Sequence, residues 1–149
     1  MTIRPVKLDA LLQRGDVLEA ARQMGRPFTM RGVVEPDIGF GKRIGIPTAD
    51  IRVVDELVPK HGIYYVMAHW DDHRFCAGAA YIGPADGMPD GQLILAVHVL
   101  DWDRPLTGFC MEVDFMAFLH EPGTEHTMQS IAQTILSDLK LTRRLSGRL

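Results

Sequence analysis

The feature that most constrains the fold is a series of short strand-like segments separated by turns and not by helices. The segments are rich in β-branched and aromatic residues and span residues 28–34, 50–54, 61–70, 75–82, 92–100 and 108–119. Glycine, proline and aspartate gather between them, most densely in residues 83–91. Parallel strands need long crossover connections, usually helices, so this pattern favours antiparallel pairing. We expect a mainly β fold, a small antiparallel barrel in which closure of the sheet removes exposed edges.

Helical patterns occur only near the two ends of the chain. Apolar residues recur at helical spacing near the N-terminus and predict two short helices, at about 8–14 and 16–24. Asp16 is the expected N-cap of the second helix, and Gly25 follows its end.

A third helix is expected from about Thr127 to Arg144, because its apolar residues form one stripe. This helix can cover an open end of the barrel. The expected division of the chain is an N-terminal helical extension, residues 1–26, followed by the barrel and its C-terminal helix, residues 27–149.

The composition excludes several functional classes. A length of 149 residues fits one domain with a real core, and a formal net charge of −3 argues against a general nucleic-acid binder. No apolar run approaches the roughly 20 residues of a membrane span, and no signal peptide is recognisable. Two cysteines, Cys76 and Cys110, do not make a disulfide framework, so we expect a cytoplasmic protein with reduced thiols.

The clearest chemical signal comes from a glycine-rich, basic segment, residues 39–50, which we call the glycine loop. Glycine takes positive φ freely and leaves no Cβ between backbone and ligand, so successive N–H groups can form an anion site beside Lys42. Pro47 stiffens the exit. Thr48 and Asp50 project from one face of an extended chain, where they can address a phosphate-bound Mg²⁺. The alternative is a hairpin loop with a solvated basic tip.

Two better-known phosphate motifs do not match this loop. A dinucleotide fingerprint has three glycines at fixed spacing before a helix, but Gly45 comes one position late and Pro47 follows. A P-loop needs Gly-Lys-Ser/Thr before a helix, but Lys42 is followed by Arg43. If the loop binds phosphate, it does so between strands.

A set of motifs follows in a characteristic order over about residues 26–145. They are Gly32-Val-Val, Gly41-Lys-x-x-Gly-Ile-Pro-Thr-Ala-Asp-Ile, His61-Gly-Ile-Tyr-Tyr, Tyr81-Ile-Gly, Val97-His-Val-Leu-Asp and Gly108…Val113-Asp-Phe…Phe118-Leu. Together they resemble the riboflavin kinase (flavokinase) family, as the kinase module of bifunctional bacterial FAD synthetases. The nucleotidyltransferase module of those enzymes is not recognisable here, so we expect no FAD synthesis.

The resemblance implies a six-stranded Greek-key barrel with a C-terminal helix. It implies transfer of the γ-phosphate of ATP to the 5′-hydroxyl of riboflavin, with Mg²⁺, a reaction that depends mainly on positioning and charge neutralisation. The implied nucleotide-binding residues are Gly39, Gly41, Lys42, Gly45, Pro47 and Thr48. The implied metal ligands are Thr48 and Asp50, and the implied flavin-side positions are Tyr81, His120 and Glu125.

The chain departs from the family at the positions that act on substrate. Ala96 stands where the family has its catalytic glutamate, and alanine cannot accept the hydroxyl proton. Asp50 replaces the asparagine of the Pro-Thr-Ala-Asn motif. His120 and Glu125 replace an arginine and a phenylalanine. The catalytic base is therefore unknown, and the candidates are Asp50 and His98, which shares a strand face with position 96.

Two functional hypotheses of different classes follow. The first is a divergent riboflavin kinase, in which phosphoryl transfer to riboflavin or a related substrate is weakened or altered. The second is a non-catalytic flavin- or nucleotide-binding module that acts as a sensor, carrier or regulator. A scaffold with a vestigial pocket is a third, weaker alternative. The expected partners are a flavin and an adenine nucleotide, without nucleic acid or membrane, and a protein partner or a separate nucleotidyltransferase remains open.

Overall fold

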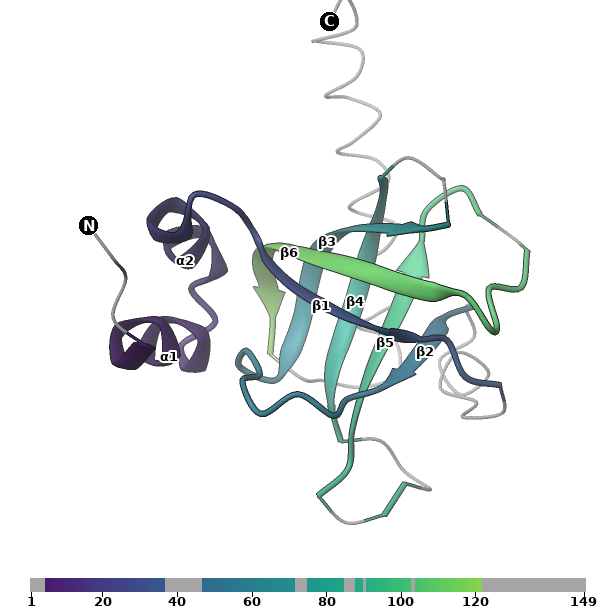
Figure 1. Cartoon of the computed structure of the whole chain (residues 1–149), viewed down its shortest axis with the longest axis horizontal. Coiled ribbons are helices and arrows are strands. Elements are labelled where there is room, and N and C mark those ends of the chain that lie inside the picture. Colours follow the sequence, from purple (N-terminus) through teal and green to yellow (C-terminus); the bar gives the residue numbers. More distant parts are fainter. Residues whose placement is uncertain are drawn as a thin grey trace, which may run out of the picture.

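The computed structural model describes residues 5–36, 47–71, 75–84, 88–89, 91–102 and 104–121. Within them, two helices come first, α1 (Pro5–Gln13) and α2 (Val17–Met24). The strands that follow are β1 (Phe28–Val33), β2 (Ala49–Arg52), β3 (Gly62–Trp70), β4 (Cys76–Pro84), β5 (Leu93–Val99) and β6 (Cys110–His120). Figure 1 shows the two helices beside one end of a curled sheet. The expected C-terminal helix and most of the glycine loop lie outside the described residues.

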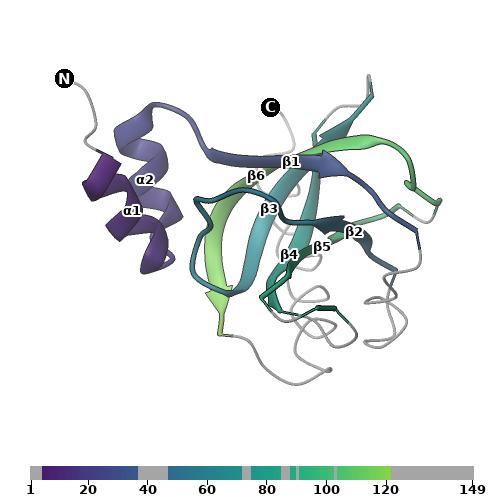
Figure 2. The ribbon, with the colours of Figure 1, turned by 60° about the horizontal axis from the view of Figure 1, so that its bottom comes forward.

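All six strands belong to one sheet, in the order β1-β6-β3-β4-β5-β2, and all neighbours are antiparallel. The sheet curls so that its outer strands, β1 and β2, approach each other (Figure 2). Just beyond β1, the Glu35 N–H donates to the carbonyl oxygen of Asp50 in β2 at 2.9 Å. This arrangement confirms the expected mainly β, six-stranded antiparallel barrel.

The seam between β1 and β2 depends on a glycine. A Cβ added at Gly32 in β1 would lie 2.4 Å from Cγ2 of Ile51 in β2, much closer than the usual 3.5–4.0 Å between carbon atoms. Ile51 is itself buried in the core. Glycine at position 32 therefore allows the two outer strands to meet.

The barrel interior is filled by side chains that alternate along the strands. In β3, Tyr64, Val66, Ala68 and Trp70 are buried, while the alternate residues between them are partly exposed. The Tyr64 ring meets Phe115 and Phe118 edge-on, with ring centroids 5.0 and 5.3 Å apart. Buried aromatic pairs of this geometry contribute packing energy beyond their apolar area.

The N-terminal helices form as the sequence predicts. At the start of α2, Oδ1 of Asp16 accepts a hydrogen bond from the Glu19 N–H, and at its end Gly25 has a φ of 79°. The first helix begins at Pro5, earlier than expected, because proline fits the first turn of a helix. In the part of the chain that the structure describes, no helix is long and apolar enough to cross a membrane.

Candidate functional site

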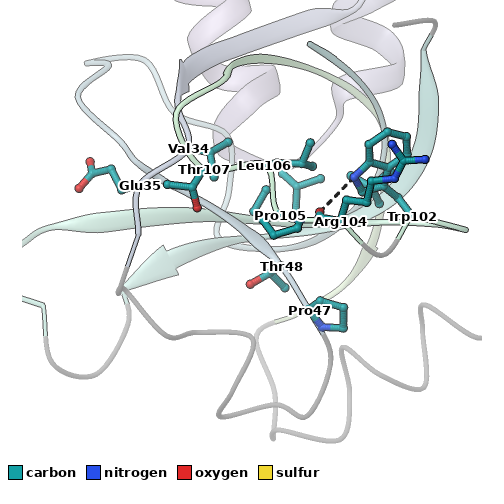
Figure 3. Close-up of a pocket in the computed structure, with 12 residues that line it drawn as sticks. Val34, Glu35, Pro47, Thr48, Trp102, Arg104, Pro105, Leu106 and Thr107 are labelled. Atoms are coloured by element: carbon teal, nitrogen blue, oxygen red, sulfur yellow. Dashed lines mark hydrogen bonds between the residues drawn. The ribbon is translucent and has the colours of Figure 1, made fainter. Parts of the chain in front are cut away.

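A cavity of about 310 Å³ lies where the chain beyond β1, the start of β2, strand β5 and the β5–β6 connection meet (Figure 3). Its lining is Val34, Glu35, Pro47, Thr48, Ala49, Val97, Val99, Trp102, Arg104, Pro105, Leu106 and Thr107. The volume is within the usual range of small-molecule sites. Most of the lining is apolar, so this cavity can accept a flat, weakly polar group such as a nucleotide base.

The polar part of the site is at the start of β2. The Thr48 hydroxyl donates to Oδ1 of Asp50 at 2.6 Å, as expected for side chains two residues apart in an extended segment. Asp50 is 5% exposed and Thr48 is half-buried. The cavity therefore ends beside two side chains that present oxygen atoms.

Hydroxyl and carboxylate oxygens are the donors that Mg²⁺ prefers, and Mg²⁺ usually keeps water and phosphate ligands as well. Thr48 and Asp50 therefore fit such an ion as a partial ligand set. Among the described residues, no group of three His, Cys, Asp or Glu side chains comes together as a metal site. The remaining ligands would have to be water or phosphate oxygens.

The aromatic wall of the cavity comes from the β5–β6 connection. The Trp102 Nε1–H donates to the Arg104 carbonyl oxygen at 3.1 Å, and the Arg104 guanidinium lies over the Trp102 ring at 5.4 Å. Trp102 also meets the buried Trp70 edge-on, with centroids 5.0 Å apart. The sequence does not point to Arg104 or Leu106 as site residues, because nothing local links this connection to residue 48.

A second group of candidate residues lies in one row across the sheet, from β2 to β6. Asp50 is the direct partner of Ala96, Ala96 of Tyr81, Tyr81 of Ile63, and Ile63 of His120. Direct antiparallel partners project from the same face, with Cβ atoms about 4.5–5.5 Å apart. The structure thus brings Asp50, Ala96 and Tyr81 together and puts His120 at the far end.

Ala96 is fully buried, yet it lies outside the cluster that fills the barrel. The same is true of Ile63, its neighbour along the row. By contrast, Val97 belongs to the barrel core, as the alternation of a strand requires. Ala96 therefore belongs to the opposite, outer face of the sheet, and it does not line the cavity.

The other candidate side chains are held by backbone carbonyls. The Tyr81 hydroxyl donates to the Pro84 carbonyl oxygen at 2.5 Å. Nδ1 of His98 lies 2.9 Å from the Pro47 carbonyl oxygen, and because a carbonyl only accepts, this nitrogen carries the proton. Nδ1 of His120 lies 2.6 Å from the Glu121 carbonyl oxygen. His98 therefore supports the exit of the glycine loop.

The remaining expected site residues fall at or beyond the limits of the described residues. Gly39, Gly41, Lys42 and Gly45 of the glycine loop lie outside the described residues, as does Glu125. Pro47 and Thr48, at the exit of that loop, are described, and both line the cavity.

Comparison with known proteins decides the family. The family model described as riboflavin kinase (flavokinase) matches residues 24–146. The chain belongs to the riboflavin kinase family. This confirms the resemblance drawn from the sequence motifs.

Relatives of this riboflavin kinase-family chain include bifunctional riboflavin kinase/FMN adenylyltransferases. The Listeria monocytogenes protein is 30% identical over 140 residues, covering 93% of this chain and 44% of the relative. The Pseudomonas fluorescens protein is 30% identical over 129 residues, covering 86% of this chain and 41% of the relative. This chain thus spans less than half the length of these relatives.

A solved structure shows the same fold. The crystal structure titled macrolide-efflux protein from Streptococcus pneumoniae superposes with a TM-score of 0.75 at 22% identity. The match covers 95% of this chain and 47% of the other. At this level of identity the likeness shows the fold alone.

Proposed function

We propose that this chain binds a magnesium adenine nucleotide in the cavity beside Thr48 and transfers its γ-phosphate to the 5′-hydroxyl of riboflavin or a related flavin, at a reduced rate. The observation that carries the proposal is the position of Thr48. Its side chain lines an apolar cavity of base size and also contacts the buried Asp50 carboxylate. One end of the site suits a nucleotide base, and the other suits a metal-bound phosphate.

On the nucleotide side, the apolar and aromatic wall would hold the base, with Trp102 at one end. The proposed phosphate-binding residues are Gly39, Gly41, Lys42, Gly45, Pro47 and Thr48. Thr48 and Asp50 would hold Mg²⁺, which neutralises the developing charge on the phosphate oxygens when it is bound. The contribution of the chain is to position the phosphates and to exclude water from the base.

On the flavin side, we assign the outer face of the sheet to the acceptor, with Tyr81, His120 and Glu125 as its contacts. Ala96 offers no proton acceptor there. Of the two candidate bases, Asp50 is better placed, because it is the direct partner of Ala96. His98 already uses Nδ1 at the Pro47 carbonyl. If Asp50 accepts the proton, Thr48, water and phosphate would hold the metal.

A non-catalytic flavin- or nucleotide-binding module is the alternative. The specific observation in its favour is Ala96, which is fully buried and has no group that accepts a proton. In that case both ligands bind, and no FMN forms.

Intrinsic fluorescence tests the nucleotide site directly, because the chain has only two tryptophans. Trp102 lines the cavity, and Trp70 packs against it. We expect saturable quenching or a spectral shift when ADP with Mg²⁺ is added to the wild type. The same titration of Trp102→Phe should lose most of the signal, since Trp70 alone remains. A flat wild-type titration at millimolar Mg-ADP, with no thermal stabilisation, would reject the proposed site.

We also propose the organisation expected from the sequence, with residues 1–26 as an N-terminal extension and residues 27–149 as the kinase-like unit. A cytoplasmic location is part of this proposal, because ATP and reduced thiols are found there. Limited proteolysis tests the division, since cleavage near residue 26 should leave a folded barrel.

A further inference from the structure

An ion pair lies at the base of the glycine loop, on the seam between the two outer strands. The Arg52 guanidinium contacts both carboxylate oxygens of Glu35, with Nε–Oε2 at 3.3 Å and Nη2–Oε1 at 3.2 Å. The Glu35 N–H also donates to the Asp50 carbonyl at 2.9 Å. Glu35 precedes the glycine loop and Arg52 follows it, so these contacts join the two stems of the loop.

Both residues of the pair are partly exposed, with side-chain exposures of 38% for Arg52 and 36% for Glu35. Ion pairs of this kind contribute little to the stability of a fold. The seam already has the close contact of Gly32 with Ile51 and the Glu35 backbone hydrogen bond. The two hydrogen bonds between Arg52 and Glu35 are therefore not needed to close the barrel.

Glu35 is also part of the cavity wall, together with Thr48. Figure 3 shows Glu35 at the end of the cavity opposite Trp102, with its carboxylate directed away from the other lining side chains. A free carboxylate at this rim would repel a nucleotide polyphosphate. Arg52 neutralises that charge through its two contacts with the carboxylate.

We propose that Glu35 and Arg52 are positioning residues of the nucleotide site. The pair sets the distance between the stems of the glycine loop, and Arg52 neutralises the Glu35 carboxylate so that it does not repel the phosphates. This inference rests on the proposed function. Arg52 acts through Glu35 and through β2, so it needs no contact with the nucleotide.

The test measures the affinity for ADP with Mg²⁺ by calorimetry, together with the melting temperature of the free protein. Arg52→Gln leaves the Glu35 charge unpaired and should weaken binding by about 5-fold or more, in the range usual for coupling between sites. Its melting temperature should stay close to that of the wild type. The double variant Glu35→Gln/Arg52→Gln removes both charges and should recover most of the affinity for Mg-ADP. Arg52→Lys keeps the positive charge but cannot make both hydrogen bonds. Its affinity for Mg-ADP should lie between those of the wild type and Arg52→Gln.

Arg31→Gln is the matched control, since Arg31 also lies on the outer strands and pairs with Glu112 at 3.4 Å, but does not line the cavity. It should bind like the wild type. Equal affinities in Arg52→Gln, Arg31→Gln and the wild type would overturn the inference and leave the proposed function intact. A large fall in melting temperature for both Arg52→Gln and Arg52→Lys would assign the pair a structural role instead. No Mg-ADP binding by the wild type would reject the proposed function itself.

Discussion

At the scale of single residues, the proposed chemistry depends on one cross-strand pair. Asp50 and Ala96 are direct partners in β2 and β5, and Tyr81 is the partner of Ala96 on the other side. The sequence resemblance puts a glutamate at position 96 and an asparagine at position 50. The family pattern thus implies a carboxylate on β5, whereas in this chain the carboxylate of the pair lies on β2.

Ala96→Glu should raise the rate of FMN formation, because it returns a proton acceptor to the outer face. The gain should be at most about 10²–10⁴-fold, the usual contribution of a positioned base. It should be partial in the single variant, since a carboxylate directly opposite Asp50 is repelled by it. Adding Asp50→Asn should give the larger gain. The assay is chromatographic detection of FMN, with Ala96→Gln as the control that lacks a base. Equal rates for Ala96→Gln and Ala96→Glu would contradict the explanation.

Asp50→Asn alone should lower the residual rate of FMN formation by at least about tenfold, within the range that general-base assistance supplies. Asparagine keeps the shape and one oxygen ligand but cannot accept a proton. Mg-ADP affinity should change less than the rate does. An unchanged rate with unchanged affinity would mean that the Asp50 carboxylate has no part in the reaction.

At the scale of secondary-structure elements, the site depends on how β1 and β2 meet. The glycine loop connects these strands, and Gly32 allows their close approach at Ile51. Strand β2 is short, with four residues, so its position relies on β5 and on the seam. Any loosening of the seam should therefore displace Thr48 and Asp50.

Gly32→Ala should destabilise the protein by about 1–3 kcal/mol, the usual cost of inserting an atom into a well-packed region. The new Cβ would occupy the space of the Ile51 side chain. Chemical denaturation measures this loss. The double variant Gly32→Ala/Ile51→Ala should be more stable than the sum of the two single losses predicts. In it, the side chains at positions 32 and 51 no longer compete for the same space. Strict additivity would show that the seam contact is not the cause.

The cap of α2 gives a second prediction at this scale. Asp16→Ala removes the acceptor of the Glu19 N–H and should cost about 0.5–2 kcal/mol in unfolding free energy. Asp16→Ser keeps a capping oxygen and should retain most of the stability. If Asp16→Ala and Asp16→Ser lose the same unfolding free energy, the capping hydrogen bond is not the cause of the loss.

At the scale of the whole molecule, Tyr64 takes part in the link between the helices and the barrel. The Tyr64 hydroxyl donates to the Lys60 carbonyl oxygen at 2.6 Å, and the Lys60 N–H donates to the Leu12 carbonyl at the end of α1. Burial, and secondarily the negative charge of Glu121, raise the pKa of Tyr64 well above its usual value. The folded protein therefore holds this hydroxyl in its neutral form.

The consequence is a loss of stability in alkali. A folded-state pKa above the unfolded value of about 10 means that the unfolded chain releases the Tyr64 proton first. The stabilisation is complete below about pH 10 and falls as the pH rises further. Tyr64→Phe should flatten this fall in denaturation curves measured from pH 8 to 11, values that bracket the unfolded tyrosine pKa of about 10. An equally steep fall of stability with pH in Tyr64→Phe would show that other groups cause the fall.

The sequence predicted the elements well and the site in part. Strands and turns follow from local alternation and from glycine and proline, so their order could be inferred residue by residue. The shared face of Thr48 and Asp50 followed from spacing in an extended chain, and in the structure the two side chains are hydrogen-bonded. The cavity wall at Trp102 and Arg104 could not be inferred as a partner of Thr48, since it depends on how distant strands pair.

The direct pairing of Asp50 with Ala96 could not be inferred from the sequence either. It requires the register between β2 and β5, and a shift of one residue would move every side chain to the other face. The ion pair of Glu35 and Arg52 depends on closure of the barrel between β1 and β2. These three-dimensional relations, more than the motifs, indicate how the site would work.

The most direct test of the account is the formation of FMN by the wild-type protein from riboflavin, ATP and Mg²⁺, followed by chromatography with enzyme in excess. We predict slow formation of FMN that needs Mg²⁺ and is strongly reduced in Thr48→Ala. Formation at the rate of an ordinary kinase, unchanged by Asp50→Asn, would contradict the proposed effect of Ala96. Complete absence of FMN, while flavin and Mg-ADP both bind, would reject the enzyme in favour of a binding module.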